Sequence, residues 1–267
     1  MTIIVYLAGF KELSLIDYPA EPSCVFWFAG CNFRCPYCYN FSFWNMEERY
    51  ATEISKLKEL MENASILSRA CKVTGGEPTL QPKALIELGL KAHKIDMKFG
   101  VDTNGSNPKV IRDLIFKYNC LDHLAIDIKA PFIPEHYRKA VGLNISSQTI
   151  NKIKETIRIA FNSKVKLELR IPLIPLINDS HQSLEKISRE IIKLGYLDNY
   201  SEERLSLVLV EVITEKSVDH RLKGLRKLNP HEMVELALRM NLPGIFIRHR
   251  KLGGKIPVDE AVKILKS

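Results

Sequence analysis

The chain has 267 residues, of which 46% are hydrophobic and 26% are charged. This balance excludes a disordered segment, a collagen-like repeat and a membrane-embedded channel. Lys and Arg number 39 and Asp and Glu number 31, so the net charge is +8. A charge of this size permits an anionic partner such as RNA but does not require one.

The N-terminus carries no basic region ahead of its first apolar run, so it does not have the pattern of a signal peptide. No stretch reaches the roughly 18 uninterrupted apolar residues that a membrane span requires. We therefore expect a cytoplasmic protein with no membrane partner, in which the thiols stay reduced.

Short apolar runs alternate with amphipathic stretches along most of the chain. The runs that predict strands cover residues 24–29, 70–74, 99–102, 123–128, 165–171, 205–212 and 245–247. The stretches that predict helices cover residues 53–63, 83–93, 108–118, 147–161, 180–194 and 230–240. Asn-Pro pairs at 107–108 and 229–230 each offer an N-cap and a first-turn proline, and residues 178–180 offer further caps.

This alternation predicts an α/β fold built from parallel βαβ units with right-handed crossovers. Because the strands are nearly all apolar, we expect helices to cover the sheet. We predict a partial (β/α)6-type barrel, with an open doubly wound sheet as the alternative that periodicity cannot separate from it. The chain is expected to form a single domain over residues 1–267. A Gly-Gly break and a short amphipathic helix predict a C-terminal appendage at about residues 249–267.

Three of the six cysteines lie within eight residues, in the C-x3-C-x2-C string formed by Cys31, Cys35 and Cys38. The string follows the first apolar run, at the strand end where parallel folds assemble their sites. Structural zinc sites, and iron–sulfur clusters that only transfer electrons, usually take four protein ligands. Three cysteines therefore predict a [4Fe–4S] cluster with one iron open to an exogenous ligand. Zinc is the alternative, with His123, His136 or another distant histidine as the fourth ligand.

The other three cysteines are scattered, each within or beside an apolar run: Cys24, Cys71 and Cys120. We expect them to be small buried hydrophobic side chains. A second cluster built on these three is therefore not expected.

The cysteine string resembles the C-x3-C-x-aromatic-C signature of the radical S-adenosylmethionine (SAM) enzymes, with Tyr37 as the aromatic residue. By this resemblance Tyr37 belongs to the segment that contacts adenine. The wider string GCNFRCPYCYN, preceded by SLIDYP, resembles the activating proteins of glycyl radical enzymes, and most of all those of anaerobic ribonucleoside-triphosphate reductases. The resemblance runs from about residue 9 to residue 248. Two positions depart from the activating-protein pattern: Tyr39 replaces a usual histidine, and Ala20 replaces a usual glycine.

Two further motifs resemble SAM-binding segments of the family. Gly75, Gly76 and Glu77 resemble the GGE motif, which implies binding of the amino group of SAM. Glycines let the backbone approach a ligand closely, and a carboxylate can accept hydrogen bonds from an ammonium group. The segment with Asp102 and Asn104 resembles the DTNG segment, which implies contacts with the ribose and methionine parts of SAM. An ordinary turn is the alternative for each motif.

Asp127 and Lys129 resemble the D-x-K element of the activating enzymes, which implies a place near SAM and the cluster. Their alternating spacing puts both side chains on one face of a strand. Arg170 stands where the family often has a contact with the carboxylate or ribose of SAM. A surface arginine is the alternative there.

The resemblance implies a [4Fe–4S] cluster and SAM as cofactors, with flavodoxin or a ferredoxin as electron donor. Reductive cleavage of SAM would give a 5′-deoxyadenosyl radical, which abstracts hydrogen from a glycine of a partner enzyme, for example an anaerobic ribonucleotide reductase. The barrel must then be open enough to admit a loop of that partner. Hydrogen abstraction needs no general acid or base, and we find no Ser/His/Asp or paired-carboxylate constellation.

Two other functions remain open from the sequence alone. The same chemistry could act on RNA or on a small molecule, and the basic run from Arg248 to Lys255 favours RNA. A solvated face is the ordinary interpretation of such a run. An alternative from another class is a non-enzymatic zinc or iron–sulfur module, which would bind no SAM.

Overall fold

A computed structural model describes residues 2–225 and 228–266 of the chain. Its strands are β1 (Ile4–Ser14), β2 (Ser23–Phe28), β3 (Ala51–Glu53), β4 (Ala70–Gly75), β5 (Lys98–Thr103), β6 (His123–Asp127), β7 (Lys166–Leu173), β8 (Leu205–Glu211), β9 (Ile245–His249) and β10 (Gly254–Pro257). Its α-helices are α1 (Ile54–Ala64), α2 (Pro82–Lys94), α3 (Pro108–Arg112), α4 (Pro134–Val141), α5 (Ser147–Phe161), α6 (His181–Lys193), α7 (His220–Lys223), α8 (Pro230–Arg239) and α9 (Val258–Lys266).

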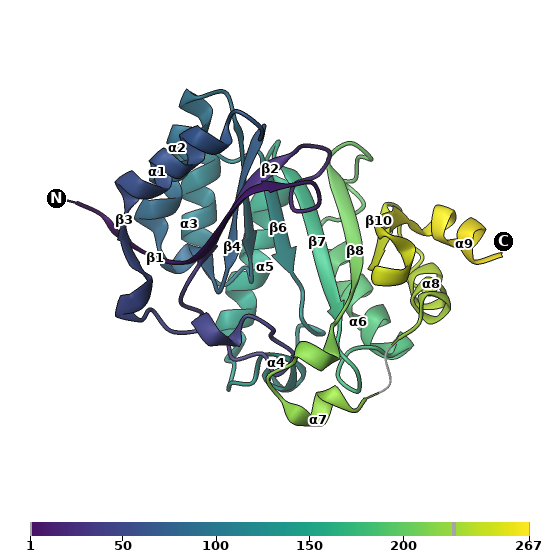
Figure 1. Ribbon diagram of the computed structural model, residues 1–267. Coiled ribbons are helices and arrows are strands. Elements are labelled where there is room, and N and C mark those ends of the chain that lie inside the picture. The colour runs from purple at the N-terminus through teal and green to yellow at the C-terminus, as the bar shows by residue number, and fades with distance from the viewer. Residues whose placement is uncertain (1, 226–227, 267) are drawn as a thin grey trace.

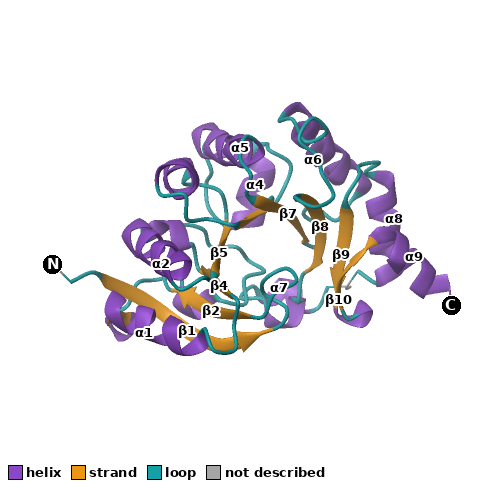
Figure 2. Cartoon of the chain, turned by 90° about the horizontal axis from the view of Figure 1, so that it is seen from above, coloured by secondary structure: helices purple, strands orange, loops and turns teal. Residues whose placement is uncertain are grey.

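The strands form one sheet in the order β10-β9-β8-β7-β6-β5-β4-β2-β1-β3. From β2 to β9 the neighbouring strands are parallel, and β1, β3 and β10 are antiparallel additions at the two sides. The sheet curls, and the helices lie around its outer side (Figures 1 and 2). Because the parallel strands follow chain order without a reversal, the predicted partial barrel is confirmed and the doubly wound alternative is wrong.

The two faces of the sheet differ in chemistry. On β7, Leu167 and Leu169 are buried in the apolar core, whereas Glu168 and Arg170 point to the inner face and form ion pairs there. The strands are therefore not uniformly apolar as expected from the sequence. The outer residues pack on helices, whereas several inner residues carry charge, among them Lys72, Asp102 and Glu168.

Most predicted helices match the structure to within a residue or two. The capping box of α8, formed by Asn229 and Glu232, confirms one predicted cap, and Ser180 caps α6. Asn107 does not cap α3, because its side chain donates instead to the Thr79 hydroxyl at 2.7 Å. Of the strands and α-helices described, the sequence analysis did not predict five, namely β1, β3, β10, α4 and α7.

The segment between β1 and β2 closes the amino-terminal end of the barrel. Tyr18 is buried, its ring centroid lies 5.3 Å from that of His123, and a Cβ on Gly100 would come within 2.8 Å of it. Ala20 has a φ of 60°, in the left-handed region that favours glycine. The glycine usual in activating proteins at this position is therefore explained by backbone conformation.

The C-terminal segment extends the sheet. After the positive φ angles of Gly253 and Gly254, β10 pairs with β9 and α9 packs on α8, while Ser267 lies outside the described residues. The single-domain organisation stays a prediction. Among the helices described, none is long and apolar enough to cross a membrane.

Candidate functional site

The cysteine loop lies between β2 and the short turn at Phe41–Phe43, at the carboxyl ends of the parallel strands. Cys35 is 7% exposed, and Cys31 and Cys38 are half-buried. Burial raises the pKa of Cys31 to about 12 and that of Cys35 to about 11, and it also raises the pKa of Cys38. These thiols therefore stay protonated unless a metal supplies positive charge.

This donor set fits an iron–sulfur cluster. Three soft sulfur ligands share one loop, and the Phe33 N–H donates to Cys31 Sγ at 3.4 Å, the kind of hydrogen bond that tunes such clusters. Within the described ranges, no three His, Cys, Asp or Glu side chains gather around a point as a single metal ion would require. Ligands of a multinuclear cluster bind separate irons, so this finding concerns only a single metal ion.

Backbone hydrogen bonds fix the loop from several sides. The Cys31 N–H donates to the Trp44 carbonyl at 2.7 Å, and the Arg34 N–H donates to the Val141 carbonyl at 2.9 Å. The latter bond comes from the end of α4, where a Cβ on Gly142 would lie 2.1 Å from the Arg34 carbonyl oxygen. Helix α4 thus supports the cysteine loop.

Gly75 and Gly76 let the end of β4 pack directly on the end of β2. A Cβ on Gly75 would lie 2.4 Å from the Phe28 carbonyl oxygen, and one on Gly76 would lie 2.1 Å from that of Gly30. The Gly76 N–H donates to Phe28 and the Glu77 N–H donates to Gly30, at 2.8 and 2.7 Å. In the structure these glycines therefore allow close packing of one backbone segment on another. Their contact with SAM stays a prediction.

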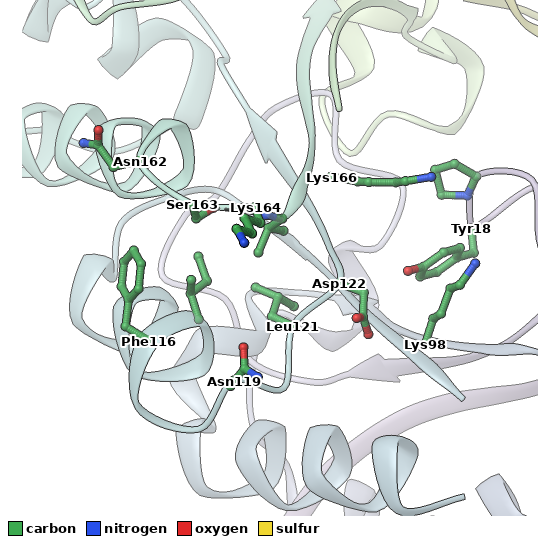
Figure 3. A pocket seen from close by; sticks show the side chains of 13 residues that line it. Tyr18, Lys98, Phe116, Asn119, Leu121, Asp122, Asn162, Ser163, Lys164 and Lys166 are labelled. Atoms are coloured by element: carbon green, nitrogen blue, oxygen red, sulfur yellow. Dashed lines mark hydrogen bonds between the residues drawn. The ribbon is translucent and has the colours of Figure 1, made fainter. Parts of the chain in front are cut away.

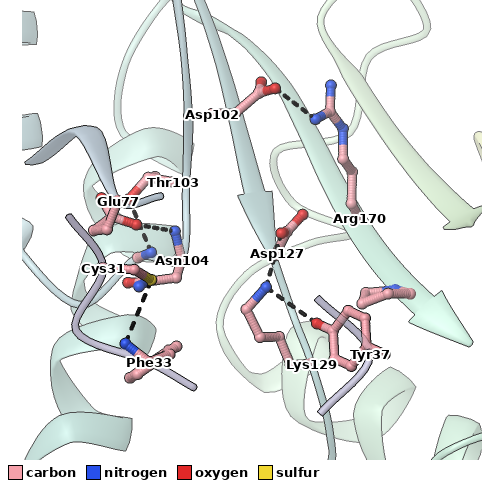
Figure 4. Close-up of polar contacts among 12 residues, drawn as sticks. Cys31, Phe33, Tyr37, Glu77, Asp102, Thr103, Asn104, Asp127, Lys129 and Arg170 are labelled. Carbon is pink, nitrogen blue, oxygen red and sulfur yellow. Dashed lines mark hydrogen bonds and ion pairs between the residues drawn. The ribbon is translucent and has the colours of Figure 1, made fainter. Parts of the chain in front are cut away.

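Glu77 joins the loops that follow β4 and β5. Its buried carboxylate accepts hydrogen bonds from the Asn104 N–H and the Thr103 hydroxyl, both at 2.7 Å (Figure 4). It also accepts from the N–H and the hydroxyl of Thr79. Burial raises the pKa of Glu77, although these bonds oppose the rise. Four protein donors thus occupy the acceptor positions of the carboxylate. A contact of this side chain with SAM stays a prediction.

Asn32 extends this hydrogen-bond chain into the cysteine loop. Its side-chain oxygen accepts from Asn104 Nδ2 and its amide donates to Ser106 Oγ, both at 2.8 Å. The sequence analysis did not single out Asn32. The available signal was the position of Asn32 between two cysteines of the motif. Its hydrogen-bond partners lie some 70 residues away, and local spacing does not predict such contacts.

Asp127, Lys129 and Tyr37 meet on the inner side of the site. Lys129 Nζ lies 2.9 Å from Asp127 Oδ2 and donates to Tyr37 Oη at 3.2 Å (Figure 4). Burial alone would lower the pKa of Lys129, but Asp127 and Tyr37 outweigh it and raise the pKa well above its ordinary value. The buried amide of Asn178 holds the Lys129 carbonyl at 2.9 Å, so Asn178 supports the site and does not cap α6.

Asp102 and Arg170 form a second group on the inner face. Arg170 Nη1 lies 2.9 Å from Asp102 Oδ2, and the buried Lys72 Nζ lies 2.6 Å from Oδ1. Burial would raise the pKa of Asp102, but Arg170 and Lys72 outweigh it and lower the pKa to about 2. Arg170 is therefore an interior residue and not a surface arginine. His123 contacts Lys72 Nζ at 2.8 Å, on the inner face below the cysteine loop.

A separate cavity of about 690 Å³ opens at the opposite, amino-terminal ends of the strands. Its lining includes Tyr18, Lys98, Asp122 and Lys166 (Figure 3). Lys98 and Lys166 begin β5 and β7, and Asp122 precedes β6, so the cavity lies away from the cysteine loop. None of the residues predicted for the site lines it.

A family model described as the radical SAM superfamily matches residues 25–191 of this chain. The match contains the cysteine string, the GGE and DTNG segments, Asp127, Lys129 and Arg170. It covers more than half of the chain.

Two relatives and one solved structure extend this result. A Methanocaldococcus jannaschii protein named as a glycyl-radical enzyme activating enzyme is 34% identical over 187 residues, which are 69% of this chain and 75% of that protein. The pyruvate formate-lyase-activating enzyme of Clostridium pasteurianum is 23% identical over 232 residues, 85% of this chain and 92% of that enzyme. A radical SAM methyltransferase from Sphaerobacter thermophilus has a similar fold, with a TM-score of 0.64 at 15% identity, covering 88% of this chain and 68% of that one.

Proposed function

The chain belongs to the radical SAM superfamily, and from this premise we propose that it activates a glycyl radical enzyme by removing a hydrogen atom from one glycine of that partner. Members of the superfamily use a [4Fe–4S] cluster and SAM, which together supply a 5′-deoxyadenosyl radical after one-electron reduction. The observation that carries the proposed subtype is the 34% identity to the archaeal protein named as an activating enzyme. The cofactors expected from the sequence are confirmed by family membership, so zinc and a non-enzymatic module are not retained.

We assign the cluster to Cys31, Cys35 and Cys38. The raised pKa values of these thiols mean that metal loading must displace their protons, so loading is favoured by higher pH. The bonds from Trp44 and Val141 hold the loop in place before the metal arrives. Preorganisation of this kind keeps ligand geometry within narrow limits.

We assign SAM to the strand ends beside this loop. The backbone of Gly75, Gly76 and Glu77 and the side chains of Asn104 and Asp102 would contact its methionine and ribose parts. Of these residues, Glu77 and Asn104 lie beside Cys31 in Figure 4. Tyr37, Asp127, Lys129 and Arg170 would line the other side. The protein contributes orientation and exclusion of water there, since a radical must meet only its target C–H bond.

We further propose flavodoxin or a ferredoxin as the electron donor, and the cytoplasm as the compartment. All six cysteines are free in the structure, which suits a reducing environment. An anaerobic ribonucleotide reductase is the partner that the sequence resemblance favours.

The test uses glycyl radical enzymes encoded in the same genome and labelled with Cα-dideuterated glycine. Each is mixed anaerobically with the reconstituted protein, SAM and dithionite. We expect deuterium in the 5′-deoxyadenosine and a glycyl radical signal in electron paramagnetic resonance. If 5′-deoxyadenosine forms without deuterium for every such enzyme, the activating function is wrong and an RNA or small-molecule substrate replaces it.

A further inference from the structure

One buried carboxylate on the inner face is shared by three cations. Glu168 is 1% exposed, and it pairs with Arg170, with Arg248 at 3.2 Å and with Lys255 at 2.5 Å. Lys255 also donates to Ser206 Oγ at 3.0 Å. The three cations come from β7, β9 and β10, so the C-terminal segment contributes directly to the interior.

The surrounding groups do not balance this charge. Asp102 pairs with Lys72 and Arg170, and Asp127 pairs with Lys129. Among the described residues, the ion pairs of Asp102 and Glu168 therefore form one network with two more cations than carboxylates, since four cations, Lys72, Arg170, Arg248 and Lys255, share these two carboxylates. A partly buried charge without a partner raises the free energy of the folded state. The surplus of positive charge therefore favours binding of an additional anion.

Arg248 and Lys255 are available for such an anion. Their side chains are 33% and 23% exposed, and within the described ranges Arg248 has Glu168 as its one ion-pair partner, bonded through Nη2. The two residues are directly opposite each other in the β9–β10 ladder, which puts their side chains on the same face. The Lys255 ammonium lies 4.6 Å from the centre of the Phe246 ring, which further fixes its position.

The rest of the basic run points elsewhere. Arg250 is exposed and pairs with Glu211 at 2.7 Å instead of with Glu168, and Lys251 is exposed as well. The run is therefore not one continuous solvated face. Only part of it, Arg248 and Lys255, joins the charged interior.

We propose that Arg248 and Lys255 bind an anionic group of the substrate, and that in an activating enzyme this group is the carboxylate of an acidic residue near the target glycine. The inference rests on the proposed function for the identity of the substrate. Charge-assisted hydrogen bonds from a guanidinium and an ammonium group are well suited to a carboxylate.

The test compares two peptides, acetyl-Asp-Gly-Asp-amide and its uncharged match acetyl-Asn-Gly-Asn-amide, by anaerobic calorimetry on protein loaded with its cluster and SAM. We expect the acidic peptide to bind at least about tenfold more tightly, with the preference declining as salt rises. In Arg248→Gln and in Lys255→Met the preference should fall to about threefold or less, whereas Lys251→Met should keep it. Two separate variants are used so that the test still holds if one of them misfolds.

Three results would overturn this inference. The first is that the wild type binds the two peptides equally or binds neither. The second is that the preference for the acidic peptide is unchanged in both Arg248→Gln and Lys255→Met. The third is that these variants bind SAM itself more weakly than the wild type does. The last result would assign the cations to the SAM carboxylate. Because binding is read without turnover, the outcome is independent of the deuterium transfer that tests the activating function.

Discussion

At the scale of single residues, the structure contains both a strained position and a strongly paired one. Ala20 adopts a left-handed backbone conformation in the segment that closes the barrel. Asp102 sits between Lys72 and Arg170 on the inner face. The first lowers stability locally, and the second makes stability depend on pH, so the two can be tested separately.

Ala20→Gly should stabilise the protein. Glycine removes the cost of placing a Cβ at a φ of 60°, and we expect a gain of about 0.5–1 kcal/mol in the free energy of unfolding. Ala51→Gly is the matched control, because Ala51 has an ordinary φ of −70° and glycine there should destabilise. Denaturant unfolding measures both, and a loss of stability in Ala20→Gly would contradict the backbone explanation.

Asp102 should make unfolding sensitive to acid. Its pKa falls from an ordinary 3.8 to about 2 on folding, because Arg170 and Lys72 outweigh the effect of burial. A lowered folded-state pKa stabilises fully above the unfolded value, and the contribution, about 2 kcal/mol, is lost as pH falls from about 4 through 2. Asp102→Asn should remove this pH dependence, whereas the exposed Asp259→Asn should retain it. An unchanged acid slope in Asp102→Asn would show that the ion pairs do not stabilise the fold.

At the scale of elements, the local sequence pattern predicted the helices and strands that have a continuous apolar face. Helices such as α5 and α6 and the central strands were predicted because each buries a regular stripe or run. Helix α4 was missed because its eight residues carry a short apolar stripe among charged side chains. Strand β1 was missed because it is an antiparallel addition with exposed polar positions. Helix α4 and strand β1 are positioned by contacts with segments that are distant in the sequence, which local patterns do not reveal.

The contact between the ends of β4 and β2 gives the element-scale prediction. Gly76→Ala would place a Cβ 2.1 Å from the Gly30 carbonyl oxygen, so the two backbones must separate. We expect a loss of about 3 kcal/mol or more in stability and reduced iron retention. Gly224→Ala is the control, since nothing lies within 4 Å of its Cβ position and its φ is −92°. Similar stability and iron content in both variants would contradict the packing role of Gly76.

At the scale of the whole molecule, the cysteine site was predictable and the charged interior was not. Cys31, Cys35 and Cys38 are close in sequence, so their spacing reveals a shared loop. The pairing of Glu168 with Lys255 spans 87 residues and depends on the curl of the sheet. Lys72 gave a weaker signal, as a charge within an apolar run, but its partner Asp102 became evident only from the structure.

The central claim is that Cys31, Cys35 and Cys38 hold the cluster at which SAM is cleaved. The most direct measurement is anaerobic reconstitution with iron and sulfide, followed by dithionite and SAM, with 5′-deoxyadenosine measured by chromatography. Wild type and Cys120→Ala should form 5′-deoxyadenosine, because Cys120 is a buried thiol outside the loop. Cys35→Ala should form none and should bind less iron. Equal product from Cys35→Ala, or a wild type that holds four irons and never cleaves SAM, would contradict the account.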